Sequence, residues 1–326
     1  WRVVETGVLD DIRHKHTEDV WLPSANINFE MSDTFMIRAA AYRAMSRFNP
    51  EFMGAGRNFG TLSNDQDYET RELALQGELD SASGGNPYIE PFLSWNGDVS
   101  FEWYLSDDTA ISTALYYKRF EAEVMSQVQQ ENLTIDGVDV LVDVRKPVIT
   151  DDTSGLWGFE LTASHVFSTL PQPFDGLGFK VSWNHTDTGF ESQDPIYGDQ
   201  VQADGTVLPG LYELVPASIY GQSDDVATAH LFWDIGSLNL SVFWKHRSEY
   251  FQPNDGGDRV HRWFDDTSYV DFSATYRFNS VWKTRFTAQN LTDEAQYASR
   301  GLRHDAPTLW NSSGIRYEIG LTATWD

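Results

Sequence analysis

The segment from Tyr250 to Asp266 contains the residue types that bind sugars. Aromatic rings stack on the faces of sugar rings, while carboxylate, guanidinium and amide groups form hydrogen bonds with the hydroxyls. The candidate ligand-binding residues of this segment are Arg259, His261, Trp263, Asp265 and Asp266, with Trp310 as a further candidate later in the chain. The alternative interpretation is an aromatic belt at a membrane interface with a solvated tip.

No stretch of the sequence has the spacing of a catalytic site. The chain lacks a Gly-Lys-Ser/Thr phosphate loop, a Gly-x-Ser-x-Gly elbow and a His-Glu-x-x-His zinc pair. His14 and His16 are spaced like metal ligands, but two histidines in an exposed acidic chain are more often solvated. The absence of cysteine excludes disulfides and thiolate metal sites. We therefore expect neither an enzyme nor a bound metal or cofactor.

The charge of the chain excludes another class of partner. It carries 49 acidic and 23 basic residues, a formal net charge of -26. Proteins that bind DNA or RNA neutralise phosphates with basic residues, so a nucleic-acid partner is excluded. The acidity fits wet, solvated loops, and the alternative is a set of acid-lined cation or substrate sites.

Residues 268–291 show the most regular pattern of the chain, two alternating segments joined by a turn at Asn279 and Ser280. One side carries Val270, Phe272, Ala274, Tyr276 and Phe278, followed by Trp282, Thr284, Phe286 and Ala288. Polar residues occupy the positions between them. A period of two predicts a β-hairpin with one apolar and one polar face. Aromatic residues at the ends of the apolar face favour a lipid-facing hairpin over a soluble sandwich.

The same alternation recurs in the segments 25–31, 35–41, 93–105, 111–117, 157–167, 177–183, 227–233, 238–244 and 317–325. Short turns lie near 32–34, 106–109, 170–176, 235–237 and 279–280, and long connections cover roughly 11–17, 48–87, 131–154, 189–223, 251–267 and 292–313. Short turns at one rim and long loops at the other are typical of outer-membrane barrels. Counting residues 1–10 as a strand, we expect about twelve strands. Segment 138–146 should prolong its strand beyond the membrane.

The sequence therefore predicts an all-β fold, an antiparallel up-and-down transmembrane β-barrel. No change in composition and no linker divides residues 1–326, so we expect one unit. No apolar run approaches the roughly 18 residues of a membrane-spanning helix. A membrane sheet must close on itself, because an open edge would leave backbone groups unpaired in lipid.

Several motifs resemble those of TonB-dependent outer-membrane receptors, in the same order along the chain. They are Leu-Pro-Ser-Ala-Asn-Ile-Asn at 22–28, Ile-Arg-Ala-Ala at 37–40, Gly-Asn-Pro-Tyr-Ile-Glu-Pro at 85–91, Phe-Glu-Trp-Tyr at 101–104 and Asn-Leu-Thr-Asp-Glu at 290–294. Each motif alone is weak, whereas the ordered set is specific. The chain departs from the family pattern at 47–50, where Arg-Phe-Asn-Pro replaces Arg-Pro, and at Asp326, where the family ends on an aromatic residue.

This resemblance implies that residues 1–326 are the C-terminal part of a larger barrel of about twenty-two strands. The TonB box and the plug domain inside the lumen would lie outside this chain. The implied function is active import of a scarce nutrient across the outer membrane of a Gram-negative bacterium, with carbohydrate favoured and ferric siderophore possible. The implied partners are TonB with ExbB and ExbD, the plug domain, lipopolysaccharide, outer-membrane lipid and a small nutrient ligand.

Two other barrels fit the predicted strand count. A complete twelve-strand barrel, such as an autotransporter translocator, needs neither plug nor TonB. A twelve-strand outer-membrane phospholipase is the less favoured alternative. Half of a larger barrel has two open edges, so we expect it not to insert stably alone.

Overall fold

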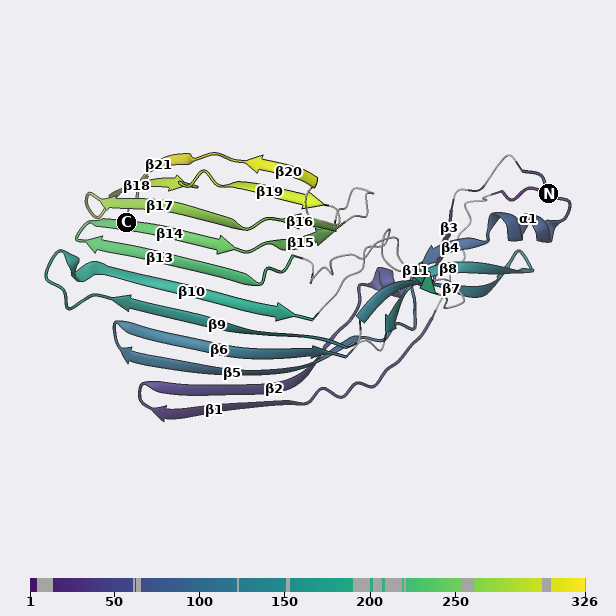
Figure 1. Cartoon of the computed structure of the whole chain (residues 1–326), viewed down its shortest axis with the longest axis horizontal. Coiled ribbons are helices and arrows are strands. Elements are labelled where there is room, and N and C mark those ends of the chain that lie inside the picture. The colour runs from purple at the N-terminus through teal and green to yellow at the C-terminus, as the bar shows by residue number, and fades with distance from the viewer. Residues whose placement is uncertain are drawn as a thin grey trace.

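A computed structural model describes residues 1–326 except 5–13, 61, 63–65, 122, 151–152, 190–199, 202–206, 209–218, 220, 254–260, 301–305 and 326. Its main sheet contains eleven antiparallel strands in the order β1-β2-β5-β6-β9-β10-β13-β14-β17-β18-β21 (Figure 1). Their bounds are β1 Ser24–Ser32, β2 Phe35–Ser46, β5 Phe92–Ser106, β6 Thr109–Phe120, β9 Ser154–Val166, β10 Leu177–Thr188, β13 Asp225–Ile235, β14 Leu238–Arg247, β17 Thr267–Arg277, β18 Trp282–Gln289 and β21 Arg316–Ala323.

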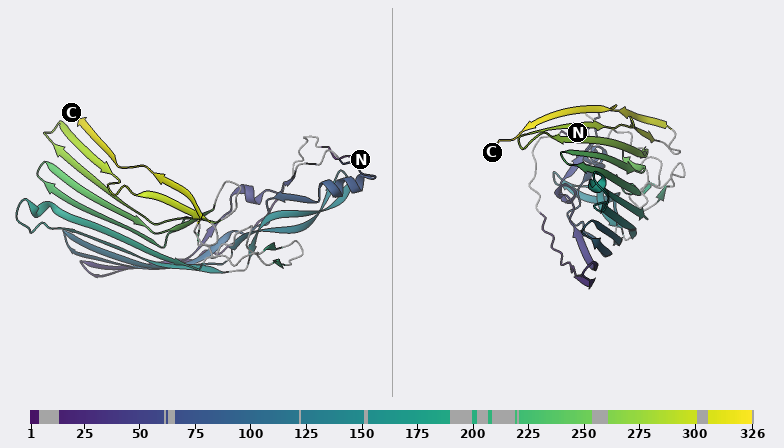
Figure 2. Two further views of the ribbon diagram at one scale, coloured as in Figure 1. Left: turned by 45° about the horizontal axis from the view of Figure 1, so that its top comes forward. Right: turned by 90° about the vertical axis from the view of Figure 1, so that its left-hand side faces the viewer.

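The main sheet is a curved, open part of a barrel. Its two edges are β1 and β21, which lie at opposite ends of the strand order (Figure 2). The all-β antiparallel prediction is therefore confirmed. The strand expected at residues 1–10 is not seen: residues 1–4 are not extended into a strand, and 5–13 lie outside the described part of the chain. The main sheet thus has eleven strands where the pattern predicted about twelve.

The predicted register is confirmed across the main sheet. Phe272 of β17 lies opposite Val242 of β14 and Ala288 of β18, and Leu115 of β6 lies opposite Val99 and Phe159. Each apolar position thus has apolar positions as cross-strand neighbours. A slip of one residue would move every apolar side chain to the polar face, so this pattern specifies the pairing.

The two ends of the main sheet differ, as the sequence predicts. Short turns join β1 to β2, β5 to β6, β13 to β14 and β17 to β18 at one end, and the long connections lie at the other (Figure 1). Among the described residues, no helix is long and apolar enough to cross a membrane.

The outer sheet consists of four strands in the order β3-β4-β8-β7 and belongs to two of the long connections. Its elements are β3 Arg57–Phe59, β4 Ser81–Gly84, β7 Glu123–Ile135 and β8 Val138–Thr150, with the short helix η1 Pro50–Met53 and helix α1 Arg71–Glu78. The expected prolongation at 138–146 is thus part of a separate sheet, in which β8 also pairs in parallel with β4. Period-two alternation could not show this, because it does not reveal which strand is the partner.

The outer sheet has its own hydrophobic core. Val140, Val142 and Val144 of β8 are at most 1% exposed, and they pack with Leu75 and Leu79 from the helix region. Thr70 caps α1 by accepting a hydrogen bond from the Leu73 amide. The Gln76 side chain bonds both backbone groups of Leu141, at 2.8 and 3.1 Å. These contacts fasten the helix to the sheet.

The rim sheet continues the main sheet beyond β14 and β17. It contains β15 Tyr250–Pro253, β16 His261–Phe264, β19 Ala295–Arg300 and β20 Ala306–Ser312 (Figure 1). The remaining elements are the pair β11 Gln200–Val201 and β12 Val207–Leu208, and the short helix η2 Phe174–Gly176. Connections that the sequence treats as loops at 251–267 and 292–313 therefore contain paired strands.

Candidate functional site

The rim sheet contains three of the sequence-predicted binding residues, His261, Trp263 and Trp310, and two more, Asp265 and Asp266, follow its strand β16. Arg259 lies outside the described residues, and His261 is the first residue of β16. Trp263 is 8% exposed and packs against Phe251, with ring centroids 5.6 Å apart. Asp265 and Asp266 are exposed at the end of β16.

Trp263 and Trp310 lie on the same face of the rim sheet. Trp263 is paired with Ser299 of β19, and Trp310 is paired with Tyr297 of the same strand. Tyr297 and Ser299 are two residues apart in β19, so they point to the same face. Trp310 is 67% exposed, in contrast to Trp263. The predicted tryptophans therefore share a face but differ in access.

This difference predicts separate results for the two tryptophans. Because Trp263 is buried against Phe251, Trp263→Ala should lower the local stability of the rim sheet by about 3 kcal/mol. Trp310→Ala, at an exposed position, should change stability by less than about 0.5 kcal/mol. Hydrogen exchange of β15 and β16 measures both. Loss of ligand affinity in Trp263→Ala with unchanged exchange would instead indicate stacking on substrate.

The opposite face of the rim sheet holds a column of stacked side chains that the sequence reading missed. The Arg247 guanidinium lies 3.7 Å from the centroid of the Tyr250 ring, and this ring stacks on Phe264 at 5.0 Å with a 6° angle between planes. The Arg262 guanidinium lies 5.0 Å from the Phe264 ring. The sequence could have indicated this column, because alternation along β16 places Arg262 and Phe264 together on the face opposite to Trp263.

The polar face of the main sheet carries paired charges, as the sequence predicts. Arg38 donates to Glu102 at 2.7 Å, and Tyr104 donates to the same carboxylate at 2.9 Å. Lys245 donates to Asp271 at 3.0 Å. These pairs support the interpretation of this face as a wet wall whose charges compensate one another.

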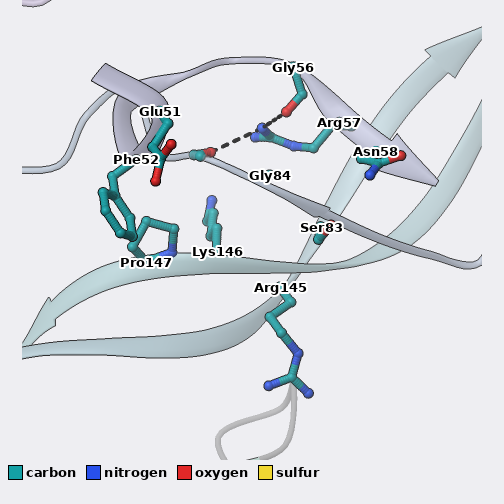
Figure 3. A pocket seen from close by; sticks show the side chains of 11 residues that line it. Glu51, Phe52, Gly56, Arg57, Asn58, Ser83, Gly84, Arg145, Lys146 and Pro147 are labelled. Carbon is teal, nitrogen blue, oxygen red and sulfur yellow. Dashed lines mark hydrogen bonds between the residues drawn. The ribbon is translucent and has the colours of Figure 1, made fainter. Parts of the chain in front are cut away.

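A pocket of about 870 Å³ lies between the two connections that form the outer sheet (Figure 3). Glu51 and Phe52 of η1 form one wall, and residues 56–58, 83–85 and 145–147 form the others. Sequence reasoning missed this pocket, because its walls come from segments that pair only in the folded chain.

The Gly-Asn-Pro motif at 85–87 builds one wall of this pocket. A Cβ atom on Gly85 would lie 2.6 Å from backbone atoms of Gly54, so only glycine permits this close approach. The Asn86 amide donates to the Phe52 carbonyl at 2.7 Å, and its side chain donates to the Pro147 carbonyl at 3.1 Å. The motif therefore ties η1 to β8.

Two cations and one carboxylate organise the pocket. Arg57 donates to both oxygens of Glu131, at 2.7 and 3.0 Å, and Lys146 donates to Oε1 at 2.6 Å. Arg57 Nη1 also donates to the carbonyls of Ala55 and Gly85. It donates to the carbonyl of Gly56 as well (Figure 3). These side chains are only 13–18% exposed.

Burial is the largest single influence on the pKa of Glu131 and raises it, but the hydrogen bonds from Arg57 and Lys146 outweigh burial and hold this pKa below its ordinary value. Glu131 is therefore ionised at neutral pH. Lys146 has Glu131 as its one hydrogen-bond partner among the described residues, although an ammonium group has three donors. Its remaining donors can bind an anion in the pocket.

The described residues contain no cluster of three or more histidine, cysteine or carboxylate side chains arranged to hold a metal ion. His14 and His16 have other partners: His14 Nδ1 lies 3.1 Å from the Tyr88 hydroxyl, and His16 Nε2 lies 2.9 Å from Glu18.

Several solved receptor structures are similar to this chain. A mutant of the ferric enterobactin receptor PfeA of Pseudomonas aeruginosa superposes with a TM-score of 0.59 at 15% identity, covering 94% of this chain and 40% of that one. The siderophore receptor PirA of Acinetobacter baumannii gives 0.58 at 14% identity, with 94% and 41% covered. The Pseudomonas aeruginosa receptor FpvA, bound to a heterologous pyoverdine, gives 0.52 at 13% identity, with 93% and 32% covered.

At such identities the likeness shows the fold alone, and this chain spans about 40% of the length of the first two of these receptors. A comparison with curated proteins found no match. Residues 4–291 match the family described as TonB dependent receptor-like, beta-barrel. This match covers most of the chain. The chain therefore belongs to the family of TonB-dependent receptor β-barrels.

Proposed function

We propose that residues 1–326 form the C-terminal part of the barrel of an outer-membrane receptor that binds a scarce nutrient and imports it with TonB-derived energy. The family match over residues 4–291 carries this proposal. The uninterrupted antiparallel order of the main sheet supports it, because it is the arrangement of a barrel wall. Members of this family are receptors and transporters, which agrees with the expectation that the chain is not an enzyme.

The proposed substrate is an iron–siderophore complex. The sequence analysis favoured carbohydrate, but the similar structures named above are siderophore receptors, and the carbohydrate preference has no support from them. The pocket supports an anionic substrate, because Arg57 and Lys146 line it in a chain of net charge -26. The rim residues Arg259, His261, Asp265, Asp266, Trp263 and Trp310 remain candidates for contact with the ligand.

The proposed partners follow from the same assignment. A plug domain would occupy the lumen against the polar face of the main sheet, and TonB with ExbB and ExbD would act through that plug. Outer-membrane lipid and lipopolysaccharide would cover the apolar face. The alternative, a complete twelve-strand barrel such as an autotransporter translocator, would need β1 and β21 to pair, and they are the two edges of the main sheet.

Uptake by the whole receptor tests this proposal. A strain that lacks its own siderophore receptors and expresses this receptor should accumulate radiolabelled iron from one or more ferric siderophores. Deletion of TonB should abolish this accumulation. Uptake of labelled oligosaccharide without uptake of any iron complex would contradict the proposed substrate, and uptake that persists without TonB would contradict the mechanism.

The pocket gives a sharper test once a transported complex is known. Lys146→Gln should weaken binding of this complex about tenfold, because one charge-assisted hydrogen bond to the anion is lost. Lys15→Gln, which removes an exposed lysine outside the pocket, is the control and should bind normally. Equal affinities of both variants would remove the pocket from the binding path.

A further inference from the structure

The rim-sheet column consists of Arg247, Tyr250, Phe264 and Arg262 in this order. The two arginines at its ends have different environments. Arg247 is bound by the protein, because its Nε donates to the Ser223 hydroxyl at 2.7 Å and its Nη2 donates to the Gly221 carbonyl. Arg262 contacts the ring of Phe264 but has no hydrogen bond or ion pair with the described residues. One end of the column is therefore structural, and the other end is available.

The available arginine is held in place and partly desolvated. Its Nε is buried without a hydrogen-bond partner among the described residues, although the side chain as a whole is half-buried. Buried polar groups are nearly always paired, so this group requires an explanation. Nη1 and Nη2 have no hydrogen bond with the described residues and, unlike Nε, are not fully buried, so a ligand can reach them. Both are donors, and together they form a planar fork.

The column lies on the face of the wall that is turned away from lipid. Lys245 and Arg247 occupy alternate positions of β14, and Lys245 bonds Asp271 on the polar face of β17. Stacking on Arg247 brings Tyr250 and Phe264 to this same side. Arg262 follows, because it is two residues before Phe264 on one strand. Its guanidinium therefore faces the lumen near the end with the long connections.

We propose that Arg262, held against Phe264, is a binding site for a carboxylate group of a small-molecule ligand. A guanidinium fork matches the two oxygens of a carboxylate, and it binds better when its orientation is fixed before the ligand arrives. Phe264 and Tyr250 supply this orientation and are positioning residues. The proposal rests on the proposed function and adds to it an acidic substrate that is recognised at the lumen mouth.

Titration of the whole receptor in detergent with benzoate tests the site, with neutral benzamide as the matched ligand. Binding is followed by saturation-transfer NMR. Benzoate should bind with a Kd of roughly 1 mM, as expected for a single charge-assisted contact, and benzamide should not bind. Arg262→Gln should weaken benzoate binding at least about tenfold. Arg262→Lys, which keeps the charge but loses the fork, should have an intermediate affinity.

Two further variants separate positioning from charge alone. Phe264→Leu should weaken benzoate although Arg262 is intact, and Phe264→Tyr should restore the affinity. Arg277→Gln removes an exposed arginine of β17, outside both the pocket and the rim-sheet column, and should bind benzoate like the original protein. Folding of each variant is checked by the heat-dependent gel shift of the barrel.

The two proposals fail separately. Iron uptake with benzoate binding that does not depend on Arg262, or with no benzoate binding, would overturn the carboxylate site alone. Benzoate binding that depends on Arg262, in a receptor that imports no iron complex, would overturn the proposed substrate alone.

Discussion

Val142→Asp is expected to unfold the outer sheet while the main sheet stays folded. Val142 is 0% exposed and lies between Val140 and Val144 in the core that helix α1 covers. An ionised carboxylate there would be buried without a partner, which costs about 4 kcal/mol or more. Folded proteins are stable by only about 5–15 kcal/mol, so this cost is a large fraction of the stability of a small sheet. Hydrogen exchange in the whole receptor should show loss of protection in β3, β4, β7 and β8 alone.

The neighbouring residue gives a matched control. Leu141 is 49% exposed, and its backbone is bonded to the Gln76 side chain of α1. Leu141→Asp should therefore change stability by less than about 0.5 kcal/mol. Equal loss of protection in both variants would show that the outer sheet has no core of its own. Loss in the main sheet as well would show that the two sheets unfold together.

Glu131→Ala is expected to destabilise the outer sheet by about 3 kcal/mol, because it leaves Arg57 and Lys146 buried without their shared anion. Their side chains are 13% and 14% exposed, so water can solvate them only in part. The control is the exposed pair Arg316 and Glu318, 71% and 62% exposed. Glu318→Ala should cost less than about 1 kcal/mol, as exposed ion pairs do. Equal costs for the two variants would contradict burial as the cause.

The same carboxylate makes the outer sheet sensitive to acid. The pKa of Glu131 is lower in the folded chain than its ordinary value of 4.5, so the unfolded state binds the proton more tightly. The stabilisation by Glu131 is complete above pH 4.5. It is lost as the pH falls through the lower pKa that Glu131 has in the folded chain. Hydrogen exchange of β7 and β8 should show this loss below 4.5, and Glu131→Gln should remove this part of the pH dependence.

The sequence predicts the main sheet well, because half of its pairings are between strands joined by short connections. Val270, Phe272 and Ala274 alternate with polar residues, and their strand β17 pairs with β18 across a turn of a few residues. Period and turn together then specify the register. The exception is the strand expected at residues 1–10, because residues 1–4, the part of it that the structure describes, form no strand.

The outer sheet and both sites depend on contacts that period and turns do not reveal. Val140, Val142 and Val144 alternate like any strand, but one of the two strands that pair with β8, β4, comes from a different connection. Trp263 was predicted to bind ligand because of its residue type. Its exposure depends instead on the face of the rim sheet on which it lies, and Phe251 packs against it there. Arg262, its neighbour in sequence, faces the other way and was not selected. Lys146 was missed for the same reason, because Glu131 and Arg57 approach it only after folding.

The parallel pairing of β4 with β8 has a consequence for the order of assembly. Ser81 lies opposite Asp143 and Ala82 opposite Val144, although β4 follows β2 and β8 precedes β9. Bringing β4 and β8 together closes a long loop, and the chain loses conformational entropy before the contacts between the strands can stabilise it. Contacts between residues so far apart in sequence slow folding. The cost falls once β5 and β6 have paired, because their hairpin brings both connections to the same end of the wall. The outer sheet, and with it the pocket, should therefore be the last part to form, after the strands that carry it are in place.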